Sequence, residues 1–222
     1  MPIGAPHHRL EETPSTNDVA RDLVKDGADH GTTVSTARQT AGKGRQGRTW
    51  DAPDGAIAVS VVVREPVDRL LPLRAGLAVA RLAGTNARVK WPNDVLVDGR
   101  KVAGVLVELE GDAAIVGIGV NAAVDVSELP GEVAARAGSL GLAADEVDDA
   151  LAALLEHLSS TLALTADEVV AALAARDALV GQAVRWNGGD GTATGIAPDG
   201  SLRVQTADGA ELLLDGGEVH LL

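Results

Sequence analysis

Four short β-type segments in close succession are the feature of this sequence that most constrains its fold. They lie at residues 87–90, 95–97, 102–109 and 113–120, and Asp98-Gly99 and Gly111-Asp112 interrupt the series. Pairs of this kind favour tight hairpin turns, because glycine adopts a positive φ without steric cost. The simplest fold for this part of the chain is therefore a meander of antiparallel strands.

Segments with helical periodicity surround the meander. Helices are expected at residues 15–27, 70–82, 145–162 and 166–179, and further strands at 32–38 and 56–63. The last helix begins after Thr165, and Glu168 stands at the spacing of a capping box. The pattern predicts an α+β fold in which helices pack against the sheet.

The pattern changes near Val180. Short alternating segments follow at residues 183–186, 191–196, 202–206 and 211–214, and glycine-containing turns separate them. Roughly 40 residues of hairpins predict a small barrel or sheet. We therefore expect two domains, residues 1–180 and residues 181–222.

Composition excludes several classes of function. The chain has no cysteine, so it cannot form disulfides, thiolate metal sites or a cysteine nucleophile. Its five histidines lack the spacing of a zinc site, so the protein alone is not expected to build a metal site. A net charge of -13 opposes binding to DNA. No apolar run approaches the length of a bilayer span and no secretion signal precedes residue 10, so we expect a soluble cytoplasmic protein without a membrane partner.

A cationic loop stands out against this acidic background. Three glycines and three cations occupy residues 42–48, which read Gly42-Lys43-Gly44-Arg45-Gln46-Gly47-Arg48. Glycine lets backbone amides approach a ligand closely, and the arginine fork matches carboxylate or phosphate oxygens. A solvated turn that balances the acidic surface is the plainer alternative, but it has no need of glycine at this spacing. The loop therefore predicts an anion site.

Two nucleotide-binding patterns fit poorly. Residues 42–47 match G-x-G-x-x-G, and residues 117–122 match its alanine-ended form, but neither opens a helix. A phosphate loop of the G-x-x-x-x-G-K-[ST] type is missing. We expect neither a Rossmann site nor a P-loop site.

Four further features add to the cationic loop. Trp50 could cover a nucleotide base or belong to the core, and residues 90–94 could bind a ligand or form a structural strand-end turn. Lys101 begins an apolar strand in which Gly104 hints at close approach by a ligand. Asn121 could be a turn residue or a ligand for phosphate or metal.

Taken in order, these motifs resemble those of biotin protein ligases. The similar blocks are Ser15-Thr16-Asn17, Gln39 with residues 42–50, Lys90-Trp91-Pro92-Asn93-Asp94, Lys101-Val102-Ala103-Gly104 and Gly117-Ile118-Gly119-Val120-Asn121. The resemblance extends over essentially the whole chain. It implies a mixed, largely antiparallel sheet flanked by helices, followed by a small SH3-like β-barrel.

The resemblance also implies an activity. ATP, with Mg, would convert biotin to biotinyl-5'-AMP, and biotin would then pass to a lysine of a biotin carboxyl carrier protein. The residues implied to bind biotin are Ser15, Thr16, Asn17, Gln39, Gly42, Lys43, Gly44, Arg45, Lys101 and Gly104. Those implied to bind ATP are Arg48, Trp50, Asn93, Asp94, Lys101 and Asn121. The catalytic set is Arg45, Arg48, Lys101 and Asp94, and Asp94 would orient or deprotonate the acceptor amine.

The chain departs from the family pattern at two points. Lys43 replaces a usual arginine, so the charge remains but the planar fork does not. Only 14 residues precede Ser15, which predicts a ligase without a DNA-binding repressor domain.

Lipoate protein ligase is the nearest alternative enzyme. Octanoyl transferase works through a cysteine and is excluded, because the chain has none. A biotin-binding regulator is disfavoured by the net charge. The apolar strands leave open a homodimer.

Overall fold

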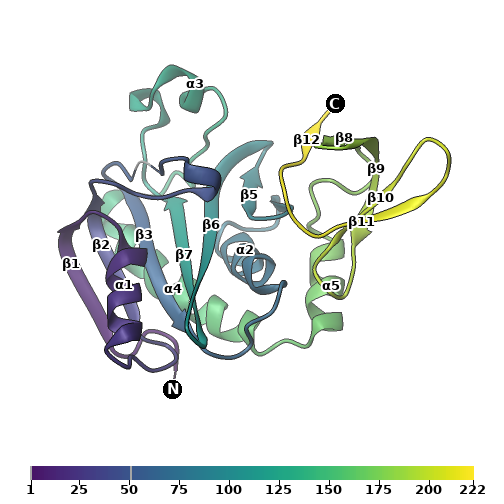
Figure 1. The fold of residues 1–222 in the computed structure, drawn as a ribbon. Coiled ribbons are helices and arrows are strands. Elements are labelled where there is room, and N and C mark those ends of the chain that lie inside the picture. The colour runs from purple at the N-terminus through teal and green to yellow at the C-terminus, as the bar shows by residue number, and fades with distance from the viewer. Residues whose placement is uncertain (1, 51) are drawn as a thin grey trace.

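A computed structural model describes residues 2–50 and 52–222, and its larger part is built on a seven-stranded sheet (Figure 1). The strand order is β1-β2-β3-β7-β6-β5-β4. β1 and β2 are parallel, and the other neighbouring pairs in this order are antiparallel. The strands are β1 His7–Thr13, β2 Thr33–Gln39, β3 Ala56–Val63, β4 Ala87–Lys90, β5 Asp94–Val97, β6 Arg100–Glu110 and β7 Ala113–Asn121. The sheet is therefore mixed and largely antiparallel.

The predicted meander is confirmed. β4, β5, β6 and β7 are successive antiparallel neighbours. Asp98 and Gly99 both adopt a positive φ, of 50° and 78°, in the hairpin between β5 and β6. β1 was not expected from the sequence, because its burial does not alternate and its extended form depends on pairing with β2.

Helices cover both faces of this sheet. The helices are α1 Thr16–Lys25, α2 Leu71–Leu82, α3 Gly131–Ala134, α4 Val147–Leu162 and α5 Ala166–Ala174, with 3-10 turns at Arg45–Gly47, Val126–Glu128 and Ala144–Glu146. Successive side chains of β3 point to opposite faces of the sheet. Val59 and Val61 join the core formed with α2 and α4, whereas Val62 packs with Ala20 and Val24 of α1. α1 covers only part of its face (Figure 1).

The expected helix at residues 166–179 is too long. The capping box of Thr165 and Glu168 is present, with the Thr165 amide 2.8 Å from the Glu168 carboxylate, but α5 ends at Ala174. Beyond it the chain pairs with β4, where the Val89 amide donates to the Arg176 carbonyl at 2.7 Å. Edge pairing with β4 thus competes with the helix and terminates it.

The C-terminal part forms a separate five-stranded antiparallel sheet in the order β11-β10-β9-β8-β12. Its strands are β8 Ala183–Trp186, β9 Gly189–Ile196, β10 Leu202–Gln205, β11 Glu211–Leu214 and β12 His220–Leu221. Four of these strands were expected, and the short β12 was missed. The small sheet contacts the larger part through Trp91, whose buried Nε1 donates to the Gly200 carbonyl at 3.0 Å. Within the described residues, no helix is long and apolar enough to cross a membrane.

Candidate active site

A cavity lies on the face of the seven-stranded sheet that α1 leaves uncovered. It brings together the N-terminal end of α1, the cationic loop, and the middle of β3, β6 and β7. Its lining residues are Ser15, Thr16, Asn17, Gln39, Lys43, Gly44, Arg45, Arg48, Thr49, Trp50, Ala58, Asn93, Lys101, Gly104, Val105, Leu106, Gly117, Ile118 and Gly119. Segments that are far apart in the sequence thus meet in one site.

The floor of this cavity is a flat region of small residues. Ala58, Gly119 and Gly104 are register neighbours on β3, β7 and β6, so they form one row across the sheet. Gly117 stands two residues before Gly119 and therefore faces the same side. A Cβ at Gly117 would lie 2.3 Å from Asn17 Oδ1. The glycines therefore leave room for neighbouring side chains, Asn17 among them, to approach the sheet closely.

The cationic loop forms the roof. Its two arms are paired, because the Trp50 amide donates to the Gly42 carbonyl at 2.9 Å and the Gly44 amide to the Arg48 carbonyl at 2.6 Å. The indole of Trp50 lies against the floor, and a Cβ at Gly119 would come within 2.3 Å of its Cε2. Within residues 2–50 and 52–222, its buried Nε1 finds no hydrogen-bond partner. The loop is therefore an ordered cover rather than a free solvated turn.

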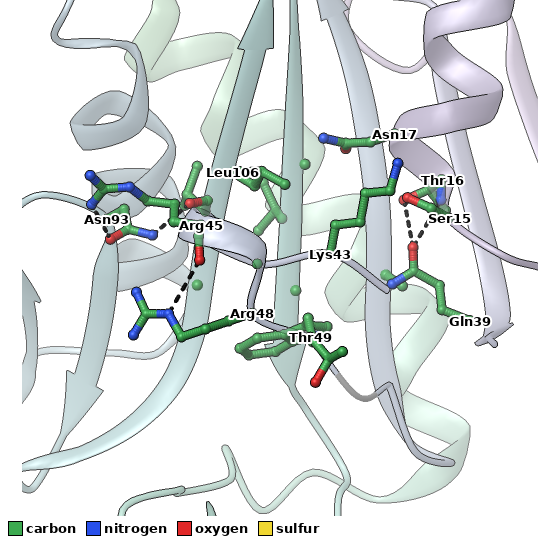
Figure 2. A pocket seen from close by; sticks show the side chains of 18 of the residues that line it. Ser15, Thr16, Asn17, Gln39, Lys43, Arg45, Arg48, Thr49, Asn93 and Leu106 are labelled. Atoms are coloured by element: carbon green, nitrogen blue, oxygen red, sulfur yellow. Dashed lines mark hydrogen bonds between the residues drawn. The ribbon is translucent and has the colours of Figure 1, made fainter. Parts of the chain in front are cut away.

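Amides and hydroxyls gather at the α1 end of the cavity (Figure 2). Gln39 Oε1 accepts hydrogen bonds from the Thr16 amide at 2.8 Å and from Thr16 Oγ1 at 3.2 Å. Behind them the buried Ser60 hydroxyl lies 2.7 Å from Thr16 Oγ1 and 2.6 Å from Asn17 Oδ1. These side chains are fixed by one another, so this end is preorganised for a neutral polar group.

Charged groups gather at the other end. Lys101 Nζ lies 2.6 Å from Asp94 Oδ1 and 5.5 Å from the centre of the Trp50 ring. Arg45 Nη1 donates to Asn93 Oδ1 at 3.1 Å, and Asn93 in turn donates to the carbonyl of the neighbouring β6 strand. Two cations thus stand beside the floor, where they would attract an anionic ligand.

The C-terminal part also reaches this end of the site. Arg48 Nη2 lies 2.5 Å from Glu218 Oε1, and Arg45 Nη2 donates to the Gly217 carbonyl at 3.3 Å. Sequence reasoning did not predict these contacts, because the partners are distant in the chain; Arg45 and Gly217, for example, are 172 residues apart.

Most of the residues predicted for the site line the cavity, with three exceptions among the described residues. Gly42 supports the loop, because a Cβ there would lie 2.2 Å from the Trp50 carbonyl oxygen. Asp94 reaches the site only through Lys101. Asn121 is buried, and its Nδ2 donates to the Gly138 carbonyl at 2.9 Å. Their predicted ligand contacts stay predictions.

Several lining residues were not assigned to the site from the sequence, namely Thr49, Ala58, Val105, Leu106, Gly117, Ile118 and Gly119, although Thr49 and residues 117–119 lie within the quoted motif blocks. The alternation Gly117-Ile118-Gly119 was a usable signal, because two glycines at period two open one face of a strand. Residues 117–122 begin inside β7 rather than at a strand-to-helix turn, which agrees with rejecting the dinucleotide interpretation. No group of three or more His, Cys, Asp or Glu that could hold a metal occurs in residues 2–50 and 52–222.

Comparison with known proteins now identifies the family. Residues 10–125 match the model of the Biotin/lipoate A/B protein ligase family, and residues 180–222 match the biotin protein ligase C terminal domain. The chain belongs to the biotin/lipoate A/B protein ligase family. It is 34% identical over 237 residues to the biotin–acetyl-CoA-carboxylase ligase of Mycobacterium tuberculosis, a match that covers 96% of this chain and 88% of that protein.

Two further relatives define how far the similarity extends. The chain is 34% identical over 158 residues to the bifunctional ligase/repressor BirA of Bacillus subtilis; the match covers 65% of this chain and 48% of that protein, so it spans about half of that relative. The structure of biotin protein ligase from Aquifex aeolicus, in complex with biotin and ATP, aligns with a TM-score of 0.84 and 28% identity over 98% of this chain and 99% of that one. The fold class predicted from the sequence is confirmed.

Proposed function

We propose that this protein joins biotin and ATP into biotinyl-5'-AMP and then transfers biotin to a lysine of a biotin carboxyl carrier protein. The observation that carries this proposal is the cavity itself, where a glycine floor connects an amide-rich end to a cationic end beneath one ordered loop. Biotin has a neutral polar ring at one end and a carboxylate at the other. The relatives named for this activity support the assignment.

The α1 end of the cavity would receive the biotin ring. Ser15 lines this end, and Thr16, Asn17 and Gln39 offer hydrogen-bonding groups there that neighbouring groups already hold in place. The aliphatic chain of biotin would lie along the glycine floor, and its carboxylate would reach Lys101 at the cationic end. Gly42, Lys43 and Gly44 would contribute mainly through backbone groups, which do not depend on the missing arginine fork.

In the first half-reaction a carboxylate oxygen of biotin attacks the α-phosphorus of ATP. The bond between that phosphorus and the oxygen bridging to the β-phosphate breaks, and pyrophosphate leaves. Repulsion between two anions opposes this step, so fixed cations stabilise the transition state. Arg45, Arg48 and Lys101 would supply them, and Trp50 would cover the base.

Mg would enter this site bound to ATP. Magnesium in ATP-using sites usually takes phosphate oxygens and waters as ligands, with only one or two protein carboxylates. Asp94 is the carboxylate beside the cationic end. Asn93 and Asn121 belong to the proposed nucleotide side of the site.

In the second half-reaction the neutral amine of an acceptor lysine attacks the carbonyl carbon of the adenylate, and AMP leaves. The amine must lose a proton, and Asp94 is our proposed group for orienting it or accepting that proton. Asp94→Asn should slow transfer from preformed biotinyl-5'-AMP more than it slows adenylate formation. Normal transfer by this variant would exclude the role.

The test of the whole proposal is pyrophosphate release from ATP and Mg with biotin or lipoate as the only added acid. We expect dependence on biotin, with a loss of about 100-fold in Lys101→Ala and in Arg45→Gly, because removing one donor from such a site costs on the order of 3 kcal/mol. Lys25→Ala is the matched control, since Lys25 pairs with Asp22 on the exposed side of α1. Dependence on lipoate would assign the lipoate branch of the family, and no turnover with either acid would favour a binding role.

We also propose how the chain is organised and where it acts. A division near residue 180 into domains 1–180 and 181–222 is supported by the separate small sheet and by the match at residues 180–222. A net charge of -13 argues against DNA binding. Use of ATP favours the cytoplasm. A homodimer, formed by continuing the sheet beyond its outer strand β1, stays a prediction.

A further inference from the structure

The cations of the loop face two opposite walls of the cavity. Figure 2 shows Lys43 extended toward α1, whereas Arg45 lies on the other side beside Asn93. Lys43 Nζ lies 2.6 Å from Asp18 Oδ1 in the first turn of α1. Asp18 is not among the residues that line the cavity. The contact therefore joins the loop to the scaffold rather than to the space for a ligand.

The carboxylate of Asp18 is also fixed by contacts on the side away from the loop. It accepts a hydrogen bond from Arg21, one turn further along α1. Arg21 Nη2 lies 2.7 Å from Glu108 Oε1 on β6, and Glu108 accepts from Asn17 Nδ2 at 2.7 Å. Because this chain of contacts fixes Asp18 to a strand of the main sheet, Asp18 cannot readily follow the loop if the loop moves.

Neighbouring cations stabilise the negative charge of Asp18. Partial burial opposes ionisation, but hydrogen bonds from Lys43 and Arg21 outweigh it and hold the pKa of Asp18 below its ordinary value. Asp18 thus stays ionised at neutral pH. Lys43 supplies a single mobile ammonium at this point, which can reach a lone carboxylate without the fixed geometry of an arginine fork.

We propose that Asp18 is a positioning residue that holds the cationic loop over the cavity through Lys43. This inference rests on the proposed function in one respect, because what the closed loop retains is the acyl adenylate between the two half-reactions. Biotinyl-5'-AMP is a mixed anhydride that water hydrolyses. The time for which the loop remains closed therefore determines how much of the adenylate is lost before an acceptor protein binds. Asp18 contributes to that time without contacting the substrate.

The first test measures retention of the adenylate. Labelled biotinyl-5'-AMP is formed on the enzyme in one turnover, the free nucleotides are removed, and release of label is followed without acceptor. Asp18→Asn should release the adenylate about two- to fivefold faster, the range expected for a partly exposed ion pair. Asp18→Glu should restore retention in part, because it returns the charge.

Asp22→Asn is the matched control. Asp22 stands one turn further along the same helix and pairs with Lys25 at 2.9 Å, with both side chains more than half exposed. This variant should release the adenylate at the wild-type rate. Lys43→Gln tests the same contact from the loop side, so the inference can still be judged if Asp18→Asn fails to fold. The double variant should be no faster than the quicker single variant, and additive effects would refute the pairing.

A second readout does not depend on the enzyme's activity. Trypsin can cleave after Arg45 and Arg48 in the loop, and cleavage there reports how often the loop opens. In the protein without ligand, Asp18→Asn should be cut at these sites about two- to fivefold faster than Asp22→Asn. Equal cleavage together with equal adenylate release would overturn the inference. If wild type makes no adenylate, the proposed function fails, while the cleavage rates still decide whether Asp18 holds the loop.

Discussion

Replacing Gly119 by alanine tests whether the glycine floor is what allows the loop to close. A Cβ at this position would lie 2.3 Å from Trp50 Cε2 and 2.4 Å from its Nε1. Ordinary contacts of a Cβ begin near 3.4 Å, so the indole would have to retreat by about 1 Å. Because Trp50 belongs to a loop, we expect most of this change to appear as displacement of the loop rather than as unfolding.

The size of the effect follows from two magnitudes. Overpacking of a well-packed site costs about 1–3 kcal/mol. If that cost falls on the closed form of the site, kcat/KM should decrease by about 5- to 150-fold, since each 1.36 kcal/mol is a factor of about ten. Displacements on the order of 1 Å around a reacting group reduce rates by about 100-fold, which agrees with this range.

Three alanine variants form a graded series. Gly131→Ala is the control, because no atom of the described part of the chain lies within 4 Å of a Cβ there. Gly104→Ala should be intermediate, since its Cβ would lie 3.3 Å from both Lys101 and Trp50. The assay is biotin-dependent pyrophosphate release, with thermal unfolding measured in parallel. Normal kcat/KM in Gly119→Ala, or a loss no larger than that of Gly131→Ala, would refute the reasoning.

The other predictions concern residues around the site. Ser60→Ala removes the buried hydroxyl beside Asn17 Oδ1. It should lower the free energy of unfolding, measured in urea, by about 1–3 kcal/mol and raise the KM for biotin. An unchanged KM would show that this hydroxyl does not contribute to biotin binding. Trp91→Phe removes the hydrogen-bond donor to the Gly200 carbonyl and should lower the free energy of unfolding by about 1–3 kcal/mol. Unaltered stability would contradict this prediction. Burial raises the pKa of Asp177, so the folded state holds its proton to higher pH than the unfolded chain, whose aspartate pKa is about 3.9. Stability conferred at low pH is therefore lost as the pH rises through the folded pKa, and Asp177→Asn should gain in melting temperature relative to wild type between about pH 4 and pH 7; a constant difference across this range would contradict it.

The sequence by itself predicted the elements whose pattern is local. β3, β4, β8 and β11 begin and end at the expected residues, because alternation and glycine turns define short strands. Ser15 and Gly27 likewise bracket α1. The motif series gave the family, and it named most residues of the cavity, because the family places ligand-binding groups in short contiguous blocks.

Tertiary structure alone decided the features that depend on distant partners. β1 is a strand because β2 lies beside it, and α5 stops at Ala174 because the following residues pair with β4. No local pattern in the sequence encodes such competition between a helix and a sheet edge.

The same holds within the site. The carboxylate that pairs with Lys43 is 25 residues away, and the one that pairs with Arg48, that of Glu218, lies just before β12. Asn121 follows a glycine-rich motif, yet its amide is directed to Gly138. Side-chain partners of this kind depend on which elements the fold brings within hydrogen-bonding distance. Thus the sequence determined which chemical groups this protein carries, and packing determined which of them meet at the ligand and which hold the site together.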